Sequence, residues 1–155
     1  MAGMWLMKSE PDEFSIDALA EVTHEPWTGV RNYQARNFMR DAMRVGDPVL
    51  FYHSNCAQPG VAGIAEVASA AYPDPTQFDP DSAYYDPKST RSAPRWLLVD
   101  IRFVRRCKRV ITLDAIRSAA EPLGDFALIR RGNRLSVLPV TAAQYQHILS
   151  LEHTA

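Results

Sequence analysis

The sequence has 155 residues, and its 17 Lys and Arg residues against 18 Asp and Glu residues give a net charge of −1. This balance excludes a protein that coats nucleic acid through bulk positive charge, so a nucleic-acid partner would have to be recognised locally. The length fits one domain, which we expect to span residues 1–155.

Cysteine spacing and hydropathy indicate where in the cell the protein is expected. Cys56 and Cys107 lie far apart with no CxxC spacing, so neither a disulfide framework nor a zinc site is expected. The first residues lack a basic segment followed by a long apolar run, and no stretch reaches the apolar length of a membrane span. We therefore expect a cytoplasmic location and no membrane partner.

The first predicted element is a short buried strand from Met4 to Lys8. This apolar run is too brief for a helix, and turn-forming residues follow it, so Ser9 and Glu10 stand at the end of the strand. Ser15 can then cap a short helix that runs to Glu21.

The stretch from Pro26 to Arg44 carries the main functional signal. After a Trp-Thr-Gly turn, the spacing of apolar residues predicts a helix that begins near Asn32 and continues to the next Gly-Asp-Pro turn. Unpaired backbone N–H groups at its start and the guanidinium of Arg31 would converge beside the flat rings of Trp27 and Tyr33. Such a corner can hold an anion or a planar polar ring. The alternative is that Trp27 is an ordinary core residue and Asn32 only a helix cap.

Two strands are predicted next, at Val49–Tyr52 and Gly60–Val67, and we expect them to pair as a hairpin. His53 and Ser54 follow the first of them. If that strand lies beside the N-terminal strand, His53 and Ser54 come close to Ser9 and to the start of the Asn32 helix.

Residues 71–94 differ in composition from the rest of the chain. Five prolines, several aspartates and four aromatic residues occur there without periodicity, which predicts a long irregular loop. Because a solvated linker would have few aromatic residues, we expect this loop to pack over the barrel, where it could act as a lid.

The C-terminal third predicts further strands and helices. A strand is expected over residues 96–104, and the basic residues within 105–109 crowd its exit as either a solvated face or a phosphate-facing edge. Thr112 can cap a helix, residues 135–138 form a last strand, and Thr141 opens a terminal helix with a capping box. These elements predict an α+β fold whose short strands curl into a small barrel.

Signals of catalysis are weak. There is no GxSxG elbow to expose a nucleophile and no glycine-rich phosphate loop, and His53 with Cys56 has no second pair of metal ligands at a usable spacing. Aromatic walls with small hydroxyls, a carboxylate and an amide instead favour a pocket for a flipped or single-stranded base.

Seven blocks of the sequence, in this order, resemble the EVE domain family, the group of thymocyte nuclear protein 1-like proteins: WLMKSEP at Trp5 to Pro11, WTGVRNYQARNFMRDAM at Trp27 to Met43, GDPVLFYHSNC at Gly46 to Cys56, PGVAGIAEV at Pro59 to Val67, DPKS at Asp86 to Ser89, PRW at Pro94 to Trp96 and RLSVLPVT at Arg134 to Thr141. The resemblance implies a PUA-like mixed β-pseudobarrel of about five or six strands with flanking short helices, a fold shared with YTH domains. It also implies binding of modified bases, since YTH domains read methylated adenine in RNA and EVE domains are associated with modified cytosines in DNA.

The same similarity assigns roles to residues from four segments. The base would be surrounded by Ser9 and Glu10 at its edge, by Trp27, Asn32 and Tyr33 as wall and floor, and by Tyr52, His53, Ser54 and Ser136 as rim. Where a YTH domain has its first cage tryptophan after Gly-Val, this chain has Arg31. That difference favours a more polar, anion-tolerant pocket.

We therefore predict a non-catalytic domain that recognises a modified nucleobase in DNA or RNA without a cofactor or a metal. Arg36, Lys88 and Arg134 are the predicted phosphate contacts. One alternative is a sensor of a free nucleoside or small anion. A third possibility is a hydrolase of modified nucleotides, which would use His53 or Ser54.

Overall fold

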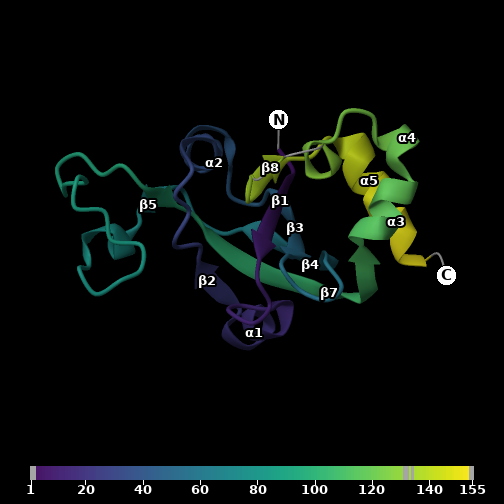
Figure 1. The fold of residues 1–155 in the computed structure, drawn as a ribbon, viewed down its shortest axis with the longest axis horizontal. Coiled ribbons are helices and arrows are strands. Elements are labelled where there is room, and N and C mark those ends of the chain that lie inside the picture. Colours follow the sequence, from purple (N-terminus) through teal and green to yellow (C-terminus); the bar gives the residue numbers. More distant parts are fainter. Residues whose placement is uncertain (1–2, 131–132, 134, 154–155) are drawn as a thin grey trace.

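A computed structural model describes residues 3–130, 133 and 135–153. Six of its strands form one mixed sheet in the order β2-β7-β4-β3-β1-β8, which curls into a half-barrel (Figure 1). These strands are β1 (Trp5–Ser9), β2 (His24–Pro26), β3 (Pro48–His53), β4 (Gly60–Val67), β7 (Asp100–Thr112) and β8 (Val137–Pro139). The α+β class expected from the sequence is confirmed.

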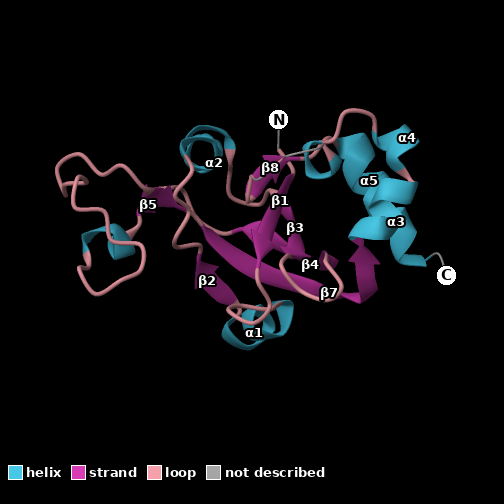
Figure 2. Cartoon of the chain, viewed as in Figure 1, coloured by secondary structure: helices cyan, strands magenta, loops and turns pink. Residues whose placement is uncertain are grey.

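Short helices flank the sheet (Figure 2). The α-helices are α1 (Ile16–Val22), α2 (Tyr33–Asn37), α3 (Leu113–Ser118), α4 (Ala120–Leu123) and α5 (Ala142–Ser150). Short 3-10 turns lie at Pro75–Phe78, Ala127–Ile129 and Leu151–His153. The predicted caps are confirmed, because the side chains of Ser15, Asn32, Thr112 and Thr141 each accept a hydrogen bond from the first turn of a helix. None of the helices in the described part of the chain combines the length and apolar character that crossing a bilayer requires.

The pairing of β1 with β3 positions the candidate site. The two strands run parallel, with Ser9 opposite His53, and the backbone N–H of Ser54 donates to the carbonyl of Ser9 at 2.9 Å. Their ends therefore lie side by side, as expected. The predicted hairpin is also confirmed, since β3 pairs antiparallel with β4.

The two faces of the sheet bury separate hydrophobic clusters. Successive strand residues point to opposite faces, so Met7 and Phe51 belong to the cluster that contains Trp27, whereas Leu6 and Tyr52 belong to the cluster under the C-terminal helices. Only the first cluster adjoins the segment that follows Trp27.

The helix expected from Asn32 to the Gly-Asp-Pro turn is shorter and less regular than predicted. After α2 the chain widens into a π-helical turn at Phe38–Ala42, and the N–H of Met43 donates to the carbonyl of Phe38 at 2.9 Å. The extra residue in this turn rotates the following side chains, so Met43 stays buried while Ala42 is exposed.

Residues 71–96 form a lobe that projects from one end of the sheet and does not pack over it (Figures 1 and 2). Two short strands, β5 (Tyr72–Pro73) and β6 (Leu97–Leu98), pair at its base. The expectation of a loop that covers the barrel is therefore wrong. The lobe is folded on itself by polar contacts, which the composition of the loop did not reveal.

The basic residues 105–109 lie within β7, which continues to Thr112, and not at the exit of a strand as predicted. Two of their side chains form ion pairs with carboxylates from other elements. Arg105 pairs with Glu152 at 3.0 Å, and Arg106 pairs with Asp17 at 2.5 Å. This part of β7 is therefore a solvated, ion-paired face.

Candidate functional site

A cavity of about 620 Å³ opens where the ends of β1 and β3 meet the segment after β2 and one residue of the lobe. Residues from five parts of the chain line it: Lys8, Ser9, Glu10, Glu13, Phe14, Glu25, Pro26, Trp27, Thr28, Gly29, Val30, Arg31, Ser54, Tyr84 and Ser136. Six of the predicted site residues are among them: Ser9, Glu10, Trp27, Arg31, Ser54 and Ser136.

Trp27 is both a core residue and a wall of the cavity. It is 8% exposed, and its ring meets Phe14 and Phe51 edge-on, with centroids 6.4 and 5.6 Å away. Its indole N–H makes no hydrogen bond within the described residues. This N–H is also not fully buried, because it is absent from the set of fully buried donors without a partner. Trp27 is therefore a core residue that also forms part of the cavity wall, which reconciles the two alternatives left open by the sequence.

The ends of β1 and β3 supply the polar edge of the cavity. The Ser9 hydroxyl donates to the carbonyl of Phe14 at 2.6 Å, and the Glu10 carboxylate accepts from the Asn55 amide at 2.7 Å. The hydroxyls of Ser54 and Ser136 have no hydrogen-bond partner in the described part of the chain. These two hydroxyls are therefore free to bind a ligand.

Carboxylates outnumber free cations around the cavity. Burial raises the pKa of Glu25, and the nearby carboxylate of Asp100 raises it further, whereas burial lowers the pKa of Lys8. Glu10 and Glu13 add two more acidic groups to the lining. Such a lining suits a ligand that presents N–H donors, and the anion tolerance expected from the sequence stays a prediction.

Arg31 does not supply the free positive charge that the sequence suggested. Its five N–H groups make five hydrogen bonds, at 2.8 to 3.1 Å, to the carbonyls of Val30 and Tyr84 and to the side chains of Asp74 and Thr76. A guanidinium has five N–H donors in all. Arg31 therefore lines the cavity but is fully occupied in joining the lobe to the body of the protein.

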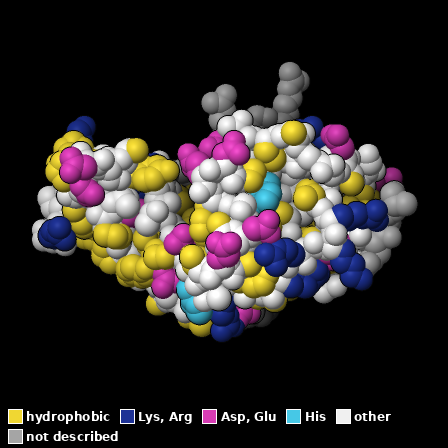
Figure 3. All heavy atoms as spheres, turned by 90° about the horizontal axis from the view of Figure 1, so that it is seen from below, with side chains coloured by type: hydrophobic (Ala, Val, Ile, Leu, Met, Phe, Trp, Pro, Cys, Tyr) yellow, Lys and Arg dark blue, Asp and Glu magenta, His cyan; other side chains and the backbone are white. Residues whose placement is uncertain are grey.

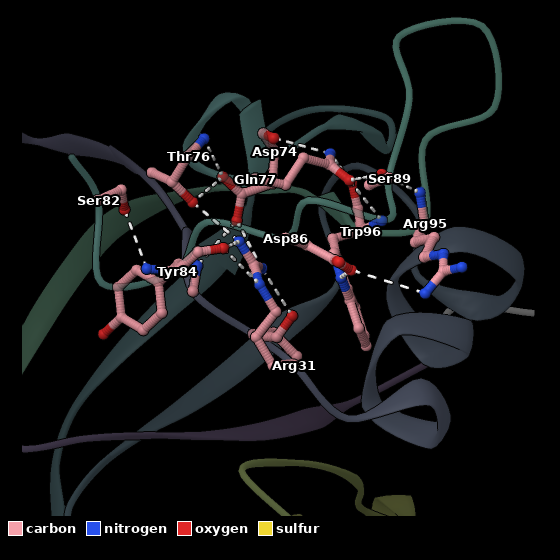
Figure 4. A network of polar contacts seen from close by, with 12 residues as sticks. Arg31, Asp74, Thr76, Gln77, Ser82, Tyr84, Asp86, Ser89, Arg95 and Trp96 are labelled. Carbon is pink, nitrogen blue, oxygen red and sulfur yellow. Dashed lines mark hydrogen bonds and ion pairs between the residues drawn. The ribbon is translucent and has the colours of Figure 1, made fainter. Parts of the chain in front are cut away.

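A network of buried polar groups holds the lobe together (Figure 4). Gln77 is completely buried, and its side chain donates to the carbonyls of Asp74 and Trp96 and accepts from the Ser89 hydroxyl and the Trp96 N–H. Asp86 accepts from the Trp96 indole at 2.8 Å, and this bond and the neighbouring Arg95 lower the pKa of Asp86. The lobe is therefore an ordered element with its own internal structure.

Four predicted site residues do not line the cavity. Asn32 caps α2 by accepting from the N–H of Ala35, and Tyr33 stacks on Trp96 with ring centroids 4.7 Å apart. Tyr52 points to the opposite face of the sheet, where strand alternation places it. His53 accepts from the backbone N–H of Ile16 through Nε2 at 3.1 Å, so it orders the start of α1.

Two of the three predicted phosphate contacts, Arg36 and Lys88, do not line the cavity. Arg36 donates to the carbonyl of Arg95 at 2.7 Å and lies over the ring of Tyr33. Lys88 is exposed on the lobe, and Arg134 lies outside the described residues. Lys88 is therefore free to contact a phosphate. Arg36 is only partly available, because its guanidinium already makes contacts within the protein.

Sequence reasoning missed the residues that reach the cavity from a distance, above all Lys8, Phe14, Glu25 and Tyr84. Phe14 lies just before α1 and Glu25 lies just after it, and no local sequence pattern marks either residue as part of a site. Tyr84 belongs to the proline-rich stretch, whose excess of aromatic residues was the one available signal.

Across the residues that the structure describes, no three His, Cys, Asp or Glu side chains are grouped to hold a metal ion. Burial raises the pKa of the Cys107 thiol to about 12, so it is protonated at neutral pH and is a poor nucleophile.

Comparison with known proteins shows to which family the chain belongs. A model of the EVE domain matches residues 3–151. The chain belongs to the EVE domain family. The family expectation from the sequence is thereby confirmed.

Relatives of this EVE domain come from animals and bacteria. It is 43% identical to mouse thymocyte nuclear protein 1, over 99% of this chain and 75% of the mouse protein. A crystal structure from Pseudomonas putida is 52% identical, with a TM-score of 0.93, over 96% of this chain and 99% of the other. Human THYN1, solved in complex with 5-methylcytosine-containing DNA, is 42% identical, with a TM-score of 0.91, over 99% of both chains.

A more distant likeness concerns the fold alone. The YTH domain of Zygosaccharomyces rouxii MRB1, solved with N6-methyladenosine RNA, is 13% identical with a TM-score of 0.54, over 97% of this EVE domain and 86% of the YTH domain. The PUA-like fold expected from the sequence is confirmed by these neighbours.

The relatives contradict the cytoplasmic location expected from the sequence. The mouse relative is named a nuclear protein, and the human one was solved with DNA. The expectation rested on the lack of a secretory signal and of a membrane span, and a nuclear protein also lacks both.

Proposed function

We propose that this EVE domain binds a modified nucleobase of a nucleic acid strand in the cavity beside Trp27 and carries out no reaction on it. The observation that carries the proposal is the cavity itself. Its volume lies in the range of about 300 to 1,000 Å³ that is usual for ligand pockets, and a largely buried indole forms its wall.

The chemistry of the lining fits a flat heterocycle with polar edges. Trp27 offers an apolar surface and a free N–H, and the hydroxyls of Ser54 and Ser136 can donate or accept. A base inside a duplex could reach these groups only after it is extruded from the stack. The complex of human THYN1 with 5-methylcytosine-containing DNA makes modified cytosine in DNA the first ligand to test.

The test compares oligonucleotides that differ in one base modification, with binding measured by fluorescence anisotropy. Wild-type protein should prefer the 5-methylcytosine oligonucleotide over its unmodified counterpart. Trp27→Ala should abolish this preference, because stacking on an aromatic side chain is worth about 1–3 kcal/mol per base. Trp27→Phe keeps an apolar ring in the core and should retain part of the preference.

Trp5→Phe is the matched control. Trp5 is buried in the same cluster, donates to Asp47 and does not line the cavity, so its substitution should lower stability and leave the preference intact. An undiminished preference in Trp27→Ala would rule out this site.

The same experiment separates the alternative functions. A sensor of free nucleosides would bind 5-methyl-2′-deoxycytidine as tightly as the oligonucleotide and would show no salt dependence from phosphate contacts. A hydrolase would change the mass of the oligonucleotide during incubation, and the change would disappear in His53 or Ser54 variants. We expect the oligonucleotide to bind more tightly than the nucleoside and to be recovered unchanged.

A further inference from the structure

The lobe reaches the cavity through one aromatic side chain, that of Tyr84. We infer that Tyr84 is the stacking surface for the nucleotide next to the captured base, so that the lobe forms a second nucleotide subsite. This inference rests on the proposed function and adds a second site to it.

The position of Tyr84 is fixed by contacts with the body of the protein. Its backbone carbonyl accepts from Nε and Nη2 of Arg31 at 3.1 and 2.8 Å, and its N–H is bonded to the Ser82 hydroxyl at 3.1 Å. Arg31 is bonded in turn to Asp74, which is 1% exposed at the base of the lobe. The backbone that carries the ring is therefore held in place before any ligand arrives, which lowers the entropic cost of binding.

Gly29 shows how closely the ring approaches the cavity wall. This residue has a φ of +87°, and a Cβ added there would lie 2.6 Å from the tyrosine ring. A larger residue at position 29 would displace the ring. The Trp-Thr-Gly turn that begins with Trp27 therefore also makes room for Tyr84, so the two aromatic residues belong to one local arrangement.

The ring of Tyr84 remains available to a ligand. The residue is 39% exposed, and its hydroxyl has no hydrogen-bond partner in the described part of the chain. The guanidinium of Arg31 lies 5.5 Å from the ring centroid, so the ring is part of an aromatic and cationic pair. Exposed aromatic rings beside cations are the usual platforms for unpaired bases, because every base has a π-face.

The surface around the lobe supports the same partner. Seen from below, the lobe carries a run of hydrophobic side chains that continues toward the body of the protein (Figure 3). Lys88 is exposed on the lobe and could meet a backbone phosphate. Tyr85 is 41% exposed, close to the value for Tyr84, but it does not line the cavity.

The experiment compares a modified nucleoside with a dinucleotide and a trinucleotide that contain it, using titration calorimetry. Tyr84→Ala should weaken the binding of the oligonucleotides by roughly 5- to 150-fold, the range for one stacked base, and weaken the binding of the nucleoside much less. Tyr84→Phe keeps the ring and should restore the oligonucleotide affinity. Tyr85→Ala is the matched control, with the same residue type and nearly the same exposure, and should behave like the wild type.

Two results would overturn the second subsite. One is an equal loss of affinity for the nucleoside and for the oligonucleotide in Tyr84→Ala, which would mean that the ring belongs to the base pocket itself. The other is an oligonucleotide affinity that Tyr84→Ala leaves unchanged. Failure of the proposed function looks different, because wild-type protein would then show no preference for the modified base and no response to Trp27→Phe.

Discussion

At the scale of single residues, hydrogen bonding decides which polar groups a ligand can use. Arg31 and His53 both lie near the cavity, yet the five N–H groups of the first and Nε2 of the second are already bonded within the protein. The Trp27 indole and the Glu25 carboxylate have no such partner among the described residues. The unbonded groups are therefore the ones that can distinguish one base from another.

Glu25 should discriminate between 5-methylcytosine and thymine. These bases share the 5-methyl group, but cytosine presents an amino donor where thymine has a carbonyl acceptor, and carboxylates accept from that amino group. Glu25→Gln should reduce the preference for 5-methylcytosine over thymine about fivefold or more, because the amide can also donate to thymine. Competition binding with oligonucleotides that differ only at this base measures the ratio.

Glu13→Gln is the control for this change, since Glu13 lies on the cavity rim but is exposed to solvent. It should leave the ratio unchanged. If Glu25→Gln also leaves the ratio unchanged, its carboxylate does not contact the edge of the base.

His53 should make the stability of the protein depend on pH. Burial lowers its pKa from the ordinary value of 6.5, and its Nε2 must be unprotonated to accept from the Ile16 N–H. Just below pH 6.5 the unfolded chain therefore binds more protons at this position than the folded one, so stability falls as the pH falls.

The measurement is thermal unfolding between about pH 8 and pH 5. The glutamine in His53→Gln can still accept the hydrogen bond but does not titrate. This variant should therefore lose less stability than the wild type on acidification, and the difference between the two losses should be below about 1 kcal/mol. His24→Gln removes an exposed histidine and should retain the wild-type profile. Identical profiles for His53→Gln and wild type would contradict the role assigned to His53.

At the scale of elements, the sequence predicts what local contacts determine. The helix caps at Ser15, Asn32, Thr112 and Thr141 and the β3–β4 hairpin follow from short-range patterns, and all are confirmed. The lobe does not follow from such patterns, because its order depends on contacts such as Arg31 with Asp74, 43 residues apart in the chain. Tyr84 was missed as a cavity residue for the same reason.

Arg31→Lys tests whether this one side chain joins the lobe to the body. A lysine ammonium has three donors at one point and cannot span the partners that the guanidinium reaches. We expect a loss of about 1–3 kcal/mol in stability. Amide hydrogen exchange should be faster at Gly29, whose N–H donates to Asp74, and in the lobe.

Arg91→Lys is the control, because Arg91 is an exposed arginine of the lobe that lies over the ring of Phe78. Its exchange pattern should match that of the wild type. Unchanged exchange in Arg31→Lys would mean that the internal network around Gln77 holds the lobe in place without Arg31.

At the scale of the whole molecule, charge limits how the protein can meet nucleic acid. The net charge is −1, and arginines along β7 are paired with Glu66, Asp17 and Glu152. These ion pairs reduce the positive charge that β7 presents, so affinity has to come mainly from the cavity and its immediate surroundings. This arrangement favours selective over non-specific binding.

The salt dependence of binding should consequently be shallow. Each neutralised phosphate contributes about −0.7 to −0.9 to the slope of log K against log salt concentration, and with Lys88 and Arg36 as the main candidates we expect a slope no steeper than about −3. Anisotropy titrations of a modified oligonucleotide between roughly 50 and 200 mM salt give this slope. Lys88→Ala should make the slope shallower by about the contribution of one phosphate. It should also weaken the binding of modified and unmodified strands equally, because a phosphate contact does not depend on the identity of the base. A slope of about −6 or steeper would instead require an extended basic interface, which the pairing of the β7 arginines with carboxylates does not provide.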